Sequence, residues 1–155
     1  MGLSLEFYAG NAEEIGKAFC SFNLDKLRDG SLTVAYADFS LHLSPVDLDI
    51  LSHEVAVILR CEPIYLLDSL VEAMCEESAE HGADKVAGEW VHMVARLADE
   101  QLEELAHNWI AGIAEEHKDP SVQVTPDAIR ALEELVQLCR VAIQNNFDVV
   151  HSWYM

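Results

Sequence analysis

Hydrophobic and polar positions alternate near both ends of the chain and recur at helical spacing between those ends. Residues 3–8 alternate in the manner of a half-buried strand, and residues 32–37 predict a second strand. The apolar phase changes after Asp38, which indicates a bulge or the end of that strand. Residues 147–154 predict a closing strand that could pair beside the first one.

Between these strands, apolar residues repeat every three or four positions, as they do in amphipathic helices. Three helix starts are clear, because Asn11 with Glu14 forms a capping box and Ser44 and Thr125 each stand before a proline. The predicted helices span residues 12–22, 45–59, 63–80, 86–97, 100–116 and 126–146.

These elements predict a helix-dominated α+β fold, with five or six helices packed on a small sheet of two to three strands. The N-terminal and C-terminal segments contribute that sheet. Because no internal repeat or change in composition marks a linker, residues 1–155 are expected to form a single globular domain.

The charge balance excludes some classes of partner. The chain of 155 residues carries 28 acidic and 9 basic side chains, which gives a formal net charge of −19 at neutral pH. Such a chain repels the phosphate backbone of nucleic acids and the anionic surface of membranes. It lacks an apolar run long enough to span a bilayer, and its first residues do not resemble a secretory signal. We therefore expect a cytoplasmic protein.

The four cysteines, Cys20, Cys61, Cys75 and Cys139, are dispersed and include no C-x-x-C pair. Each lies on or beside an apolar helical stripe, where a free cysteine packs as a small hydrophobic residue. Packing is therefore the expected role, and the alternative is one reactive or disulfide-forming thiol.

Many acidic side chains are grouped along the sequence in a way that local helix stability does not explain, because some groups fall at predicted helix C-termini, where they oppose the helix dipole. The grouped residues are Glu76, Glu77 and Glu80; Glu100, Glu103 and Glu104; Glu115 and Glu116; and, on the last predicted helix, Glu133 and Glu134. The first three groups are the candidate partner-binding residues. The plain interpretation is a solvated surface that favours solubility. The functional interpretation is a binding surface for a basic protein, because clustered carboxylates steer cationic partners.

A metal or catalytic site is the second hypothesis. Glu89 and His92, and again Glu104 and His107, have the i, i+3 spacing of metal sites in helical bundles. The helical wheel turns both pairs toward solvent, where a metal would find too few ligands. His53 falls on a second apolar stripe and is expected to be buried, either as a core histidine or as a general base.

The chain ends in three large, mostly apolar side chains, Trp153, Tyr154 and Met155. Free termini are usually polar, so this end is expected to be fixed against other residues. Packing within the monomer is the simpler explanation, and a homodimer contact through Trp153 and Tyr154 is the alternative.

Together these features predict a small acidic protein-interaction domain without enzymatic activity. Its expected partner is a protein, in particular a basic protein such as a nuclease. No cofactor is expected. The alternative is a metal-binding or hydrolytic enzyme that uses His53 or the pairs Glu89/His92 and Glu104/His107. A role within a larger assembly is a third hypothesis.

Overall fold

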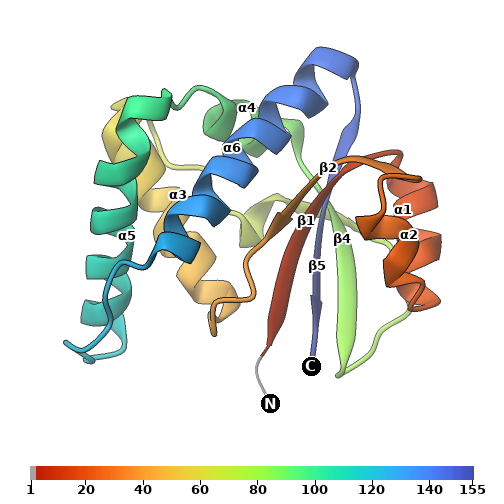
Figure 1. Ribbon diagram of the computed structural model, residues 1–155, viewed down its shortest axis with the longest axis horizontal. Helices are drawn as coiled ribbons and strands as arrows, with labels where there is room; N and C mark the ends of the chain where they lie inside the picture. The colour runs from red at the N-terminus through yellow and green to blue at the C-terminus, as the bar shows by residue number, and fades with distance from the viewer. Residues whose placement is uncertain (1–2) are drawn as a thin grey trace.

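The strands form one antiparallel sheet whose middle is made from the two ends of the chain (Figure 1). The computed structural model describes residues 3–155, in which the strand order is β2-β1-β5-β4-β3. The strands are β1 (Ser4–Gly10), β2 (Thr33–Asp38), β3 (Leu70–Ala73), β4 (His81–Val86) and β5 (Asp148–Tyr154). The predicted pairing of the closing strand with the first strand is confirmed.

Helices cover both faces of the sheet, with α3 to α6 on one face and α1 and α2 on the other (Figure 1). The helices are α1 (Ala12–Cys20), α2 (Leu24–Arg28), α3 (Pro45–Leu59), α4 (Gly88–Ala95), α5 (Leu102–Glu116) and α6 (Pro126–Asn145). Short 3₁₀ turns over Leu67–Ser69 and Asp99–Gln101 precede β3 and α5. Within residues 3–155, no helix is long and apolar enough to cross a membrane. The predicted α+β class is confirmed.

β1 is buried on both faces, and the two faces belong to different hydrophobic cores. Leu5 and Phe7 lie in the larger core beneath α3 to α6. Tyr8 lies in the second core, where it packs with Ile15 and Phe19 of α1. The strand predicted for residues 3–8 is therefore confirmed, but its predicted half-burial is wrong, because α1 and α2 cover the face that the alternation assigned to solvent.

Burial of this second face encloses a charged side chain, Glu6. Only 1% of Glu6 is exposed, and the hydroxyl groups of Tyr8 and Tyr36 donate hydrogen bonds to its carboxylate. The guanidinium of Arg28, at the end of α2, forms an ion pair with the same carboxylate and also donates to the hydroxyl of Tyr154. A buried carboxylate is tolerated only where it is paired and hydrogen-bonded, so these contacts fix α2 against the sheet.

The helix starts are the best-predicted local features. The side chain of Asn11 accepts a hydrogen bond from the N–H of Glu14 (3.1 Å), and that of Thr125 accepts one from the N–H of Ala128 (3.2 Å). Ser44 precedes α3 as predicted. Such side chains satisfy backbone donors that lack a partner in the first helical turn. The starts of α1, α3 and α6 are therefore confirmed.

The predicted helix over residues 63–80 is wrong. This segment instead contains a 3₁₀ turn, β3 and the loop that leads to β4. Its apolar spacing fits a helix, but its backbone pairs with β4, where Glu72 lies opposite Lys85. Pairing with the next strand along the chain overrides local spacing. The sheet consequently has five strands, and the predicted two to three is an undercount.

Other boundaries also differ from the prediction. α4 is shorter than residues 86–97, because Val86 ends β4 and the helix begins two residues later. α5 begins after a 3₁₀ turn, in which the side chain of Gln101 accepts a hydrogen bond from the N–H of Ala98 (2.9 Å). α2 was not predicted, and it follows directly on the predicted end of the first helix.

Two of the four cysteines are joined. Cys20, at the end of α1, and Cys75, just after β3, form a disulfide, whereas Cys61 and Cys139 are free. Burial raises the pKa of the Cys139 thiol, which suits a packing role. The disulfide is the alternative that the sequence left open. Because disulfides persist mainly in oxidising compartments, this bond counts against the cytoplasmic location, which stays a prediction.

The apolar C-terminus packs within its own chain. Trp153 and Tyr154 are both half-buried, and Trp153 lies over Gly82 of β4. The hydroxyl of Tyr154 accepts a hydrogen bond from Arg28 (2.9 Å). These contacts explain an apolar end without a second copy of the chain. A dimer contact through Trp153 and Tyr154 stays a prediction.

Replacement of Gly82 tests the close packing of β4 against β5. A Cβ at this position would lie 2.5 Å from Nε1 of Trp153, whereas one at Gly88 would meet nothing within 4 Å. Gly82→Ala is expected to lower the free energy of unfolding by about 1–3 kcal/mol. Gly88→Ala, in the first turn of α4, is the matched control and should raise it by at most about 1 kcal/mol. Equal stability of the two variants in urea unfolding would contradict this packing.

Removal of the disulfide tests whether it holds the end of β3 to α1. Cys20→Ser/Cys75→Ser is expected to lower the free energy of unfolding by about 2–4 kcal/mol, because the open chain gains freedom when it unfolds. Cys61→Ser, at a free and partly exposed thiol, is the control and should change little. Peptide mapping without reductant should recover a fragment that links Cys20 to Cys75, and recovery of both as free thiols after air oxidation would refute the bond.

Candidate functional site

The eight glutamates predicted to bind a partner do not lie on one face. All are exposed, and they occupy three places. Glu76, Glu77 and Glu80 lie in the β3–β4 loop, Glu100, Glu103 and Glu104 around the start of α5, and Glu115 and Glu116 at its end. α5 has 15 residues, so its two ends are about 20 Å apart. Figure 1 also shows α5 on the side of the molecule away from β4.

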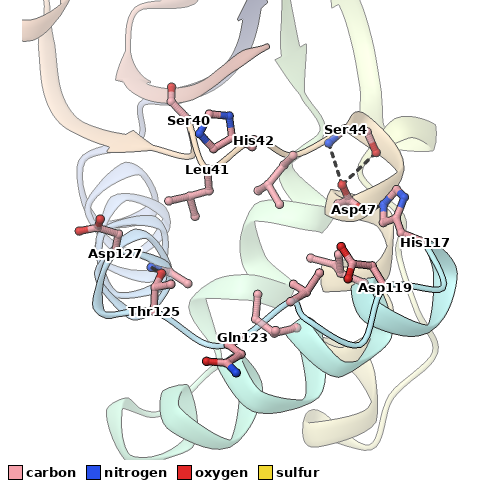
Figure 2. A pocket seen from close by; sticks show the side chains of 15 residues that line it. Ser40, Leu41, His42, Ser44, Asp47, His117, Asp119, Gln123, Thr125 and Asp127 are labelled. Carbon is pink, nitrogen blue, oxygen red and sulfur yellow. Dashed lines mark hydrogen bonds and ion pairs between the residues drawn. The ribbon is translucent and has the colours of Figure 1, made fainter. Parts of the chain in front are cut away.

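A different set of residues surrounds a cavity of about 740 Å³ (Figure 2). Its walls are the loop between β2 and α3, the start of α3, the end of α5 and the start of α6. Its apolar lining includes Leu41, Leu43, Ile110, Ile113 and Val122. An apolar cavity of this size with a few polar groups at its rim is typical of ligand sites.

Asp47 organises one wall of this cavity, although its side chain is only 3% exposed. One carboxylate oxygen accepts hydrogen bonds from the N–H (2.7 Å) and the hydroxyl (3.0 Å) of Ser44, as Figure 2 shows. The other oxygen lies 2.7 Å from Nε2 of His117. The backbone carbonyl of Asp47 accepts a hydrogen bond from Nε1 of Trp109 (2.7 Å). Asp47 thus joins the start of α3 to α5.

His117 stands at the end of α5 and faces Asp47. The hydrogen bond and the charge of Asp47 raise the pKa of His117 above its ordinary value of about 6.5. An imidazolium complements the negative C-terminal end of α5, and a carboxylate complements the positive N-terminal end of α3. The pair is therefore explained by the packing of two helix ends.

An aspartate that orients a histidine is also part of a catalytic triad, which requires a nucleophile beside the histidine. The hydroxyl of Ser44 donates to Asp47 instead. Within residues 3–155, the ring of His117 forms a hydrogen bond with Asp47 and with no other residue. The pair thus lacks a positioned nucleophile and orders the wall of the cavity.

A second cavity of about 350 Å³ adjoins the first, because Ser40, Leu41 and Asp127 line both. It lies between β2, at one edge of the sheet, and α6. Asp38 and Glu134 line it, and the N–H of Asp38 donates a hydrogen bond to the carboxylate of Glu134 (3.3 Å). We call the two cavities together the acidic groove.

Carboxylates outnumber basic groups in the acidic groove. Five of them line it: Asp38, Asp47, Asp119, Asp127 and Glu134. Asp127 forms an ion pair with Arg130 (3.0 Å), and Asp47 faces His117. The other three are in no ion pair within the described part of the chain. Hydrogen bonds from Ser121 lower the pKa of Asp119, which keeps that carboxylate ionised.

Sequence reasoning missed the acidic groove because its carboxylates come from separate segments of the chain. Adjacent glutamates drew attention, yet neighbouring helical residues point about 100° apart. One signal was present, since Asp127 and Glu134 are two helical turns apart and therefore lie on the same side of α6. The contribution of Asp38 from β2 required the tertiary fold.

The residues of the predicted metal or catalytic site are dispersed. Glu89, His92, Glu104 and His107 all face solvent, as the helical wheel indicated. The prediction of a buried His53 is wrong, because the side of α3 that carries it is exposed. Across residues 3–155, no three His, Cys, Asp or Glu side chains converge where they could hold a metal ion.

His151 is the other histidine with an altered pKa, and it lies outside the groove. It is buried in β5 against Phe7, and its Nδ1 is 3.2 Å from the carbonyl of Glu6. Burial lowers the pKa of His151 to about 4, so its ring is neutral at neutral pH. It is a core residue of the sheet.

The pair of His117 and Asp47 gives a pH-dependent prediction. Because the folded-state pKa of His117 is raised, its stabilisation is full below about pH 6.5 and is lost as the pH rises through the folded value. His117→Gln should therefore lower the urea midpoint most in mildly acidic buffer and least in mildly alkaline buffer. His107→Gln, at an exposed histidine of the same helix, is the control and should show no such trend. A His117→Gln deficit that grows with pH would refute the pairing.

Comparisons with known proteins assign no function to the chain. Family models, curated proteins and solved structures were compared with it, and none of them matches. Because a fold alone does not determine a function, the function must be inferred from the acidic groove and the surfaces around it.

Proposed function

We propose that this protein is a non-enzymatic interaction domain that binds a basic protein, and that the acidic groove receives a lysine or arginine side chain of that partner. The observation that carries the proposal is the position of Asp38, Asp119 and Glu134, which have no ion-pair partner in the described chain. Asp119 lines the larger, apolar cavity of the groove, and Asp38 and Glu134 line the smaller cavity that adjoins it. A long basic side chain matches both features, because its stem favours apolar surface and its end favours carboxylates.

The charge of the whole surface supports the same class of partner. Five of the nine basic side chains are already in ion pairs with carboxylates: Lys17, Arg28, Lys85, Arg130 and Arg140. The remaining excess of carboxylates gives a negative field that attracts a cationic protein, over about 8–10 Å at moderate salt. Association should therefore be fastest at low salt.

The enzymatic alternative has less support. His53 is exposed, and the pairs Glu89/His92 and Glu104/His107 lie on solvent-facing sides of two helices. A general base needs a substrate-sized cavity and a reacting group within hydrogen-bond reach. The lining of the acidic groove includes none of these five residues.

Two variants with the same change in charge test the groove. The groove variant is Asp38→Asn/Asp119→Asn/Glu134→Gln, and the control variant is Glu100→Gln/Glu103→Gln/Glu104→Gln. Each amide in the groove variant keeps an oxygen that can accept the backbone hydrogen bonds already present. The control removes three charges from the start of α5, away from the groove.

The probe is a fluorescein-labelled peptide of arginine and glycine, titrated at low salt and followed by fluorescence anisotropy. The groove variant should bind it about tenfold more weakly, because three exposed charge contacts together contribute about 1.4 kcal/mol. The control should bind within about twofold of the wild type. Equal losses in both variants would show that net charge alone attracts the peptide, and the groove proposal would fail.

A further inference from the structure

The two edges of the sheet differ. At the β2 edge, the N–H of Asp38 is bonded to Glu134 of α6. At the β3 edge, Val71 is 60% exposed, and Glu72 and Ala73 are exposed too. The β3 edge is therefore open to a partner.

The hydrogen-bond register shows which backbone groups are available at this edge. The N–H of Met74 bonds to the carbonyl of Ala83 (2.7 Å), and Glu72 lies opposite Lys85. The register shifts between Leu70 and Glu72, and beyond that shift inward and outward positions alternate along the antiparallel strand. The N–H and C=O of Ala73 therefore point away from β4, toward the place that a further strand would occupy.

A cavity of about 550 Å³ adjoins β3 at Val71. Pro63, Ile64 and Tyr65 supply apolar lining, and Asp68 and Glu89 supply carboxylates. No basic side chain is among the residues that line it. This recess offers room for a side chain of a segment that lies along β3.

Carboxylates surround this edge. Six exposed ones lie on or near it: Asp68, Glu72, Glu76, Glu77, Glu80 and Glu89. None of them is in an ion pair within residues 3–155. The disulfide from Cys75 to Cys20 ties the end of β3, and the acidic loop after it, to α1. The charge is therefore presented beside a strand that is held in place.

We propose that the β3 edge binds an extended basic segment of a partner protein, which adds to the sheet as a further strand. Backbone groups of the segment pair with Ala73, as in other complexes formed by strand addition. Side chains alternate along the segment, so basic ones lie opposite Glu72 and apolar ones enter the recess beside Val71.

A second copy of this chain is a poor occupant of the same edge. Pairing of β3 with β3 would bring the acidic segments of two chains together, each chain carrying a net charge of −19. Like charges on facing strands are destabilising. The carboxylates thus protect the open edge from self-association and select a cationic segment in its place.

This surface and the acidic groove lie at opposite edges of the sheet, so the two proposals can be tested separately. The probe is a fluorescein-labelled peptide of alternating lysine and valine. A second version, methylated at every backbone nitrogen, keeps the charges and side chains but has no backbone donors. Strand addition predicts that methylation weakens binding about tenfold or more.

Protein variants and amide exchange locate the binding site. Glu72→Lys should weaken binding of the alternating peptide about tenfold, whereas Glu104→Lys, the same charge reversal on α5, should weaken it about twofold at most. Hydrogen exchange of the Ala73 amide should slow when the unmethylated peptide binds. The groove variant of the previous section should bind this peptide like the wild type.

Three results would overturn the proposal. They are equal binding of the methylated and unmethylated peptides, unchanged exchange at Ala73 in the presence of bound peptide, and a dimer of the free protein that Ala73→Pro abolishes. The last result would assign the edge to a second copy of the chain. Loss of binding in the groove variant alone would instead place the peptide in the acidic groove.

Discussion

The pairing of β1 with β5 is the constraint on which the rest of the structure depends. It places the two ends of the chain side by side in the middle of the sheet, where helices packed on each side remove both faces of β1 from water. The segments between the two ends of the chain must then pack on one face of the sheet or the other, which produces a large helical layer and a small one. The same constraint encloses Glu6, and the charge of Glu6 requires Arg28 and thereby the position of α2.

The acidic groove follows from how the chain leaves this sheet. After Asp38 the chain turns, because Phe39 enters the core and His42 adopts a left-handed backbone conformation (φ 61°) before α3 begins. Helix ends then meet around one cavity, and acids in the first turns of α3 and α6 are favoured there by the helix dipoles. The carboxylate of Asp47 is already occupied by the contacts that join two helix ends. Asp119 and Glu134, in contrast, have no ion-pair partner in the described chain, so a ligand could use them.

Features that depend on a few neighbouring residues could be predicted from the sequence. The caps at Asn11, Ser44 and Thr125 are examples, because each acts on backbone groups within one turn. β3 and β4 could not be predicted, because β3 exists only through its pairing with β4, and β4 in turn pairs with β5 from the other end of the chain. The predicted burial of His53 is wrong for a similar reason, because an apolar stripe on a helix does not show whether another element packs against it. The acidic groove combines both cases. The sequence alone places Asp127 and Glu134 on the same side of a helix, whereas only the tertiary fold brings Asp38 to them.

The net charge of the chain has different consequences at different places in the fold. The glutamates around α5 lie on the solvent-facing side of that helix and are not among the residues that line the acidic groove, as a solvated surface requires. Beside β3 the carboxylates flank the outward-pointing backbone groups of Ala73, where we propose that charge also limits self-association. In the acidic groove they border an apolar cavity, where we propose that charge and shape together select a basic side chain. A carboxylate is therefore informative about a partner only where the fold sets it beside a second feature that a ligand can use.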